Sequence, residues 1–298
     1  MAGKELIYKD RGYELIIGDY KNDPNNAAMI DNLQITFDVS KSSSNKDRSN
    51  SCTIEIYNLP DDVLALLDKE FIAAEFNAGY YSTHIKRLFA GQVAQVTTRK
   101  AGPDLVTQVR MGAGYQALNF SVLNDTVAPG KKKKEVLEAL RKQITGINRG
   151  VYSGLNCESP VVSGYPLTGT PRAALNKLCS DSGMEYTIDN NTLYVMDQGK
   201  SFTSNLEQAI LVSPDSGLYD IAYKVSGEGI RKKGDPAKQP GIQFQAALNA
   251  DYLAGAIIKL EQDTPIDGFY KVESVRHSGS WRGGQWVSEV RCSQRIST

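Results

Sequence analysis

Two stretches far apart in the chain have almost the same sequence. Leu105–Met111 reads LVTQVRM and Trp286–Cys292 reads WVSEVRC, so both follow the order apolar, Val, hydroxyl, Gln or Glu, Val, Arg, sulfur. Apolar residues at every second position are typical of a strand with one buried face. A short match of this kind also arises by chance, and the flanking residues decide whether the chain contains a repeat.

The residues before the two stretches extend the match. Val93 and Val96 stand three positions apart before the first stretch, and Val272 and Val275 do the same before the second. The spacing from each pair to its stretch differs by two residues, in a glycine-containing segment that we expect to be a hairpin loop. Because loops tolerate changes of length, we predict two copies of one β module. The alternative is that any two antiparallel hairpins look this similar.

The same valine pairs predict a local irregularity. A spacing of three breaks the alternation of a regular strand, so each pair indicates a β-bulge or bend, as closing barrels need. Further upstream the agreement between the copies is looser. A short helical turn and a strand over residues 58–78 compare with residues 248–263.

The residues between the two copies have a different pattern. Lys134–Ile144 carries apolar residues at helical spacing, and Thr170 followed by Pro171 is typical of the start of a second helix. Gly183 predicts the end of that helix. Asp189–Asn191 predicts the turn of a hairpin.

We therefore predict a mainly β protein in which two related tube-type β-barrel domains flank a small α+β insert. The predicted boundaries are residues 1–121 for the first barrel, 122–200 for the insert and 201–298 for the second barrel. Residues 41–50 form a polar loop by composition. Residues 226–240 are rich in Gly, Lys and Pro, and we expect them to be an exposed, mobile loop.

Composition limits the classes of function. The 298 residues include 34 basic and 34 acidic side chains, so the net charge does not indicate generic attraction to nucleic acid or anionic membranes. The chain has no run of about 18 apolar residues, and its N-terminus has no long apolar core. We expect neither a membrane anchor nor a secretory signal, and synthesis in a cytoplasm. The four cysteines lack C-x-x-C or zinc-like spacing, which favours buried residues in a reducing compartment.

Three local signals for other functions have simpler interpretations. Gly112–Ala117 has the G-x-G-x-x-A spacing of a dinucleotide site, but a poor helix follows it and the strand before it belongs to a predicted hairpin. Lys131–Lys134 is short for a nucleic-acid surface and is typical of a solvated lead into a helix. His277 is a lone histidine near a hairpin loop, where packing or surface roles are commoner than catalysis. We expect no enzymatic activity, cofactor or metal.

Aromatic residues at strand ends are the candidates for contact with a partner protein. Trp281 stands at the tip of the second predicted hairpin, and Tyr270 lies in the strand before it. Tyr80 and Tyr81 end a predicted strand of the first copy. Aromatic side chains are enriched among the residues that dominate protein interfaces. The alternative is that these rings pack in the core or across strands.

The order of the segments resembles a known family. The resemblance is carried by Ile54–Asp62 (IEIYNLPDD), Ala78–Tyr80 (AGY), Leu88–Val93 (LFAGQV), Leu248–Leu260 (LNADYLAGAIIKL) and Gln285–Cys292 (QWVSEVRC). These patterns look like the baseplate hub proteins of contractile phage tails, whose relatives include the hub portion of type VI secretion spikes. The resemblance spans most of the chain and rests on strand and turn patterns, without a catalytic signature.

The resemblance implies a structural protein of the virion tail baseplate. It implies a trimeric ring in which each chain supplies two tube-type barrels, so that six similar modules join a threefold spike to a sixfold tail tube. The expected partners are further copies of the chain, the tail spike protein, and the tail tube or tube-initiator protein. The tape-measure protein is a further candidate, and sequence-specific binding of nucleic acid is not expected.

Three other functions are open at the level of sequence. One is a tail-associated peptidoglycan hydrolase that uses the insert, although no Asp/Glu pair stands in a recognisable lysozyme context. The second is a distal tail adaptor of the siphophage type, which would share the barrels and assemble differently. The third is a carbohydrate-binding β module, which would expose stacked aromatic residues.

Overall fold

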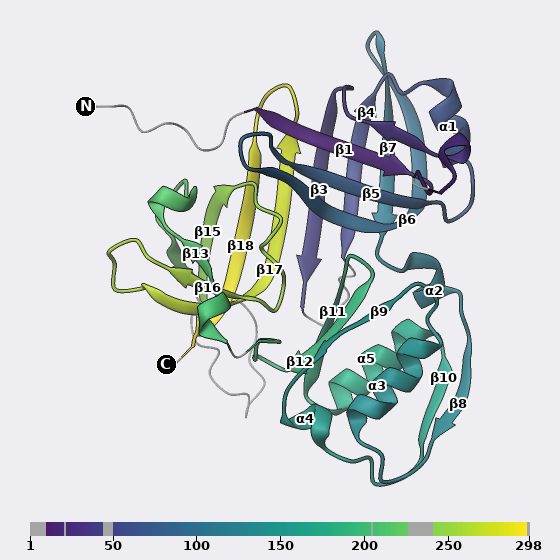
Figure 1. Ribbon diagram of the computed structural model, residues 1–298, viewed down its shortest axis with the longest axis vertical. Coiled ribbons are helices and arrows are strands. Elements are labelled where there is room, and N and C mark those ends of the chain that lie inside the picture. Colours follow the sequence, from purple (N-terminus) through teal and green to yellow (C-terminus); the bar gives the residue numbers. More distant parts are fainter. Residues whose placement is uncertain (1–9, 21, 44–49, 204, 226–240, 297–298) are drawn as a thin grey trace.

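The structure is a computed structural model that describes residues 10–20, 22–43, 50–203, 205–225 and 241–296. One 13-stranded sheet takes strands from both ends of the chain, and two small sheets belong to the segment between them (Figure 1). This arrangement confirms the predicted fold class, a mainly β protein with an α+β insert. The predicted loop at residues 226–240 and most of the polar loop at residues 41–50 lie outside the described residues.

The N-terminal part of the sheet, which we call the N-terminal module, contains seven strands and one α-helix among its described residues. Its strands alternate buried and outward-facing side chains, as in β4, where Cys52, Ile54 and Ile56 are buried. In sheet order the strands are β3 (Ile35–Ser42), β4 (Ser51–Tyr57), β7 (Asp104–Gly112), β6 (His84–Ala101), β5 (Ala73–Tyr80), β1 (Arg11–Ile17) and β2 (Ala28–Ile30), with η1 (Pro24–Asn26) before β2 and α1 (Asp61–Leu67) between β4 and β5.

The insert alternates helices and short strands. Thr170 caps α5 by accepting a hydrogen bond from the Ala173 amide, and Gly183 follows the helix with φ of +62°, as the sequence predicts. The hairpin turn also falls at its predicted place. In chain order the elements are α2 (Tyr115–Asn119), β8 (Leu123–Val127), α3 (Lys133–Lys142), β9 (Asn148–Tyr152), α4 (Leu155–Glu158), β10 (Tyr165–Gly169), α5 (Pro171–Asp181), β11 (Met184–Asp189) and β12 (Thr192–Asp197).

The C-terminal part of the sheet, which we call the C-terminal module, has six strands. The alternation of apolar residues predicts strands at about residues 209–212, 219–225, 255–260, 268–277 and 285–292, and five of the described strands fall there, although β14 is shorter than its predicted span. β15 is not predicted. In chain order the elements are η2 (Leu206–Gln208), β13 (Ile210–Val212), η3 (Pro214–Ser216), β14 (Tyr223–Val225), β15 (Gly241–Ala247), β16 (Ile257–Leu260), β17 (Gly268–Ser280) and β18 (Trp286–Arg295).

The two hairpins that contain the repeated stretches have the same register. β6 pairs with β7, and β17 pairs with β18, and in each hairpin the first strand skips one residue at the same point. The predicted bulges are therefore confirmed, because both fall directly after the first valine of each pair. The pairs that flank the bulges are Val93–Met111 and Gln95–Arg110 in the first hairpin, and Val272–Cys292 and Ser274–Arg291 in the second.

The neighbouring strands correspond in the same way. β4 lies against β7 as β15 lies against β18, and β5 lies against β6 as β16 lies against β17. Equivalent pairs are Ile54–Val109 and Phe244–Val290 on one side, and Ala74–Gly91 and Ile258–Tyr270 on the other. Chance likeness of two hairpins does not account for agreement over three strand pairs, so the repeat covers the centre of both modules.

Outside this centre the copies differ. The segment equivalent to α1, residues 248–256, contains turns and no helix. β1 runs antiparallel to β5, whereas β13, at the equivalent position, runs parallel to β16. The sequence predicts two separate barrels; the strand order instead runs through both modules as one path that ends at β14 and β2.

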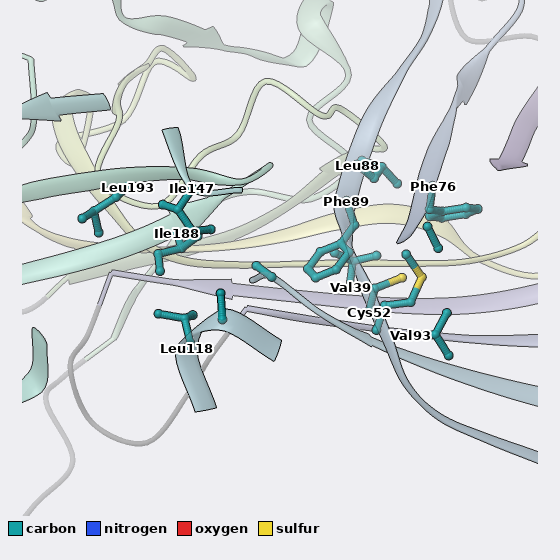
Figure 2. Packing of buried hydrophobic residues seen from close by; sticks show 14 of the residues in the cluster. Val39, Cys52, Phe76, Leu88, Phe89, Val93, Leu118, Ile147, Ile188 and Leu193 are labelled. Carbon is teal, nitrogen blue, oxygen red and sulfur yellow. The ribbon is translucent and has the colours of Figure 1, made fainter. Parts of the chain in front are cut away.

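Apolar residues fill two clusters. One lies inside the C-terminal module, and the other continues from the N-terminal module into the insert. Figure 2 shows part of the second cluster, with Val39, Cys52 and Phe76 of the sheet on one side and Leu118 and Ile188 of the insert on the other. Because one cluster spans both parts, the insert is packed against the N-terminal module.

Two buried ion pairs hold the insert hairpin β11–β12 against both modules. Lys41 of β3 lies 2.6 Å from Asp189 (Nζ to Oδ1), and the two side chains are 1% and 9% exposed. Lys271 of β17 pairs with Glu185. Burial lowers the pKa of Lys271 to about 8. Each module therefore contributes one lysine to an acidic residue of the same hairpin.

The Lys41→Met variant should lose about 3–5 kcal/mol of unfolding free energy, because it leaves the Asp189 carboxylate buried without its partner. Denaturant unfolding followed by circular dichroism measures this loss. The double variant Lys41→Met/Asp189→Leu is the control, and it should recover to within about 1 kcal/mol of the wild type. A loss below about 1 kcal/mol in the single variant would contradict the assignment.

His277 lies where β17 meets both β18 and β3. Its side chain is fully buried, and its Nδ1 lies 2.8 Å from the Ser288 hydroxyl. The Ser288 hydroxyl also accepts a hydrogen bond from the Asn249 amide, and it can donate its own hydrogen to His277 Nδ1. Burial, together with the nearby Lys41 ammonium, holds the pKa of His277 well below its usual value.

A depressed pKa in the native state makes stability depend on pH. Below pH 6.5 the unfolded chain binds a proton at His277 and the native chain does not, so stability falls as the pH falls. Between pH 7.5 and 5.5 the wild type should lose about 1.4 kcal/mol more than His277→Asn, whose side-chain oxygen can replace Nδ1 as acceptor. Urea unfolding at both pH values checks this difference. Equal losses in the two proteins would rule out a buried neutral His277.

Candidate functional site

The two modules meet in a strand pair that we call the seam. Beyond its bulge, β17 pairs antiparallel with β3, from Ser274 opposite Ser42 to Ser280 opposite Thr36 (Figure 1). Before the bulge the same edge of β17 pairs with β16. The seam thus joins strands that lie more than 200 residues apart in the chain, and it makes the two modules one continuous sheet.

Side chains on either side of the seam fix this joint. Trp286 is 1% exposed, and its ring packs edge-on against Phe37 with the ring centroids 5.0 Å apart. The Trp286 indole donates to the Gly79 carbonyl at 3.1 Å, and the Tyr80 hydroxyl donates to the Trp286 carbonyl at 3.2 Å. Arg11 donates to the Ser280 carbonyl at 3.0 Å. β1, β3 and β5 of the N-terminal module therefore all contact the β17–β18 hairpin.

The four aromatic residues predicted as partner contacts have different surroundings. Tyr80 and Tyr270 are buried inside the chain, each 4% exposed. Trp281 is half-buried, packs edge-on against Tyr13 and donates to the Arg11 carbonyl, so it belongs to the contact between the modules. The Tyr81 ring is 64% exposed. The predicted contact with another protein stays a prediction, and of the four residues Tyr81 has the accessible ring that such a contact needs.

Several strand edges lack a neighbour among the described residues, including those of β2 and β13, and two others are the counterparts of the edges that meet at the seam. Beyond its bulge, β6 pairs with β7 through Gln95–Ala101, and no described strand pairs with its other edge. β14 pairs with β15 and is the last strand of the sheet path on that side. We call these the open edges. Their backbone N–H and C=O groups are free to pair with a further strand.

Exposed apolar residues gather next to the β14 edge. Ile221 is 74% exposed, Tyr223 is 55% exposed and Tyr219 is 52% exposed. These residues alternate over a short segment that ends in β14 itself. Clustered apolar side chains at the surface of a folded protein commonly mark an interaction site.

The outward face of the sheet near the seam is polar. Arg276 forms an ion pair with Asp38 across the seam, and Arg99 lies 3.0 Å from Glu55. A polar hollow of about 580 Å³ lies over the seam, and its lining includes Ser274. Because these charges are paired within the chain, they do not single out one type of charged partner.

The described residues offer little for catalysis. No group of three or more His, Cys, Asp and Glu side chains that could hold a metal ion is found among them. Burial raises the pKa of the cysteine thiols, that of Cys157 to about 11, so none is poised as a thiolate nucleophile. His277 is fully buried and cannot reach a substrate.

The remaining sequence signals also have structural explanations. Gly112–Ala117 enters the short helix α2, but the strand before it belongs to an antiparallel pair, which is not the parallel setting of a dinucleotide site. Lys132 and Lys134 both bind Glu158, and this carboxylate raises the pKa of Lys132. No helix within the described ranges is long and apolar enough to span a membrane.

Comparison with known proteins finds similarity in structure alone. No protein-family model matches the chain, and no curated protein matches its sequence. The structure is similar to the 43 kDa tail protein of prophage MuSo2 from Shewanella oneidensis, with a TM-score of 0.64, 10% identity, and coverage of 96% of this chain and 98% of that one. It is also similar to a tail protein from Neisseria meningitidis, with a TM-score of 0.63, 11% identity, and coverage of 96% and 97%.

A third similar structure comes from a secretion system. It is an Escherichia coli component of the type VI secretion system that is described as structurally similar to bacteriophage T4 tail proteins gp27 and gp5. The TM-score is 0.59 at 11% identity, over 89% of this chain and 76% of that one. The chain therefore has the fold of phage tail proteins and of this secretion component.

Proposed function

We propose that the chain is a structural hub protein of a contractile injection device, most plainly the tail baseplate of a phage. In this role it forms a trimeric ring that joins a threefold central spike to a sixfold tail tube. The observation that carries the proposal is the internal repeat, in which the central strands of two modules of one chain have the same register and bulge. Similarity to tail proteins over nearly the whole chain supports it.

The repeat supplies the symmetry that such a joint needs. A chain with two similar modules lets three chains present six similar units, so a trimer can match a sixfold tube on one side and a threefold spike on the other. Such a ring uses heterologous contacts, in which unlike surfaces of neighbouring chains meet and the rotation closes. The two copies need not be identical for this purpose, and the differences between β1 and β13 leave room for unlike contacts with spike and tube.

The seam supports a mechanical role. β3 and β17 form one sheet, and buried ion pairs tie the insert to both strands. A sheet bonded across the module boundary transmits load through backbone hydrogen bonds. We propose that the polar outward face of this sheet lines the passage of the ring, and that Tyr81 is among the residues that contact a partner protein.

Light scattering tests the ring. The purified chain alone should have a mass three times that of the 32.6 kDa chain, and its complex with the spike or tube protein of the same particle should have a mass that corresponds to three copies of the chain plus the partner. A trimer that forms only with the spike is also consistent with the proposal, because a ring stabilised by its neighbours is still a ring. A chain that stays monomeric under every one of these conditions would contradict it.

A second measurement separates the structural role from the rival enzyme. The purified chain should release no more soluble sugar from peptidoglycan than buffer does, because no Asp/Glu pair of the sequence stands in a recognisable lysozyme context. A lysozyme of known activity is the control for the substrate. Release by the chain above buffer, abolished by denaturation, would favour the hydrolase.

A further inference from the structure

The internal repeat gives each strand edge at the seam a counterpart. β17 of the C-terminal module corresponds to β6 of the N-terminal module, and β3 corresponds to β14. Inside the chain, the edge of β17 beyond its bulge pairs with β3. The counterparts of these two edges are the open edges of β6 and β14, which pair with each other in no described part of the chain.

The registers of the paired strands fix which residues correspond. In the hairpins, Arg276 and Ser278 of β17 occupy the positions of Thr97 and Arg99 of β6. β3 pairs with β4, and β14 pairs with β15. Because β4 and β15 are equivalent, their paired residues show which residues of β3 and β14 correspond. The three equivalences are Ser40 with Val225, Val39 with Lys224, and Asp38 with Tyr223.

We propose that the open edge of β6 in one chain pairs antiparallel with β14 of a neighbouring copy, in the register of the internal seam. The register places Thr97 opposite Val225, and Arg99 opposite Tyr223. This inference rests on the ring proposed above and names the strands that close it. Each chain then carries one internal seam and donates to two seams between chains.

The side chains that would meet are compatible. Thr97 and Val225 are both β-branched, a combination that suits facing positions in a sheet. The Tyr223 ring, 55% exposed in the single chain, would lie opposite the Arg99 guanidinium, which can pack on an aromatic face. The third pair sets Thr98 opposite Lys224, and no like charges face each other.

The proposal also explains why the exposed apolar residues lie where they do. Ile221 and Tyr223 are exposed beside an edge that a neighbouring copy would cover. An open edge is a liability in a soluble protein, since it offers unpaired backbone groups to any chain. Because the two open edges of one chain differ, pairing each edge with the other kind on the next chain is a heterologous contact, which forms a ring when the rotation closes.

A cysteine pair tests the register directly. In Thr97→Cys/Val225→Cys the two thiols should lie within disulfide range across the contact between chains, because directly opposite residues in antiparallel strands have Cα atoms about 4.5–5.5 Å apart. After mild oxidation, a non-reducing denaturing gel should show covalent dimers and trimers that reduction removes. The four native cysteines are buried, so they do not compete.

Two matched variants control the geometry. Arg276→Cys/Ser40→Cys places the pair at the equivalent position of the internal seam, and it should form a disulfide within one chain and run as a monomer. Gln95→Cys/Tyr223→Cys offsets the register by four residues, about 13 Å along a strand, which is beyond disulfide reach. It should give about tenfold less covalent dimer than Thr97→Cys/Val225→Cys.

The outcomes separate the two proposals. Covalent trimers from the in-register pair alone support the strand pairing. A trimer by light scattering without cross-linking at residues 97 and 225, or with equal cross-linking of the offset pair, overturns the pairing and leaves the ring. A chain that is monomeric under every condition, with no interchain disulfide, overturns both.

Discussion

The architecture depends on a limit of antiparallel pairing, in which each edge of a strand bonds one neighbour at a time. β17 keeps β18 along one edge and divides the other between β16 and β3. The change falls at the bulge: Val272 still bonds to Gly255 and Ala256, and the Glu273 carbonyl already accepts from Ser43. The bulge is therefore the point at which the C-terminal module stops being self-contained and joins the other module.

The N-terminal module has the same bulge, but no described strand beyond it joins the edge of β6 opposite β7. Val93 donates to the Ile72 carbonyl at 2.9 Å, as Val272 does to Ala256, and β6 then leaves β5 at its own bulge. No described strand takes the place that β3 has beside β17. In the proposed ring, one chain contains a completed joint and supplies both strands, β6 and β14, that joints with its neighbours need. This accounts for a chain that is well packed internally and still leaves these two edges open.

Much of this could be predicted from the sequence where the signal is local. The spacing of Val93 and Val96, repeated at Val272 and Val275, predicts both hairpins and both bulges, and Thr170 and Gly183 predict the ends of α5. The seam was beyond prediction, because nothing in β3 alone indicates which distant strand it pairs with. β15 was not predicted since the sequence before it is irregular, and the parallel direction of β13 depends on chain path. The sequence predicts Tyr80 and Tyr270 as candidate contacts with a partner. Their burial depends on the seam and on local packing, and composition reveals neither.

The central claim is that one chain carries two equivalent modules so that three chains can imitate six. The rotational symmetry of the assembled particle, seen end-on by electron cryo-microscopy, tests this most directly. The account predicts rings of threefold symmetry whose sheet layer has a strong sixfold component, one unit for each module. Rings of six chains, twofold dimers, or a threefold ring whose two modules lie at clearly different radii would contradict it.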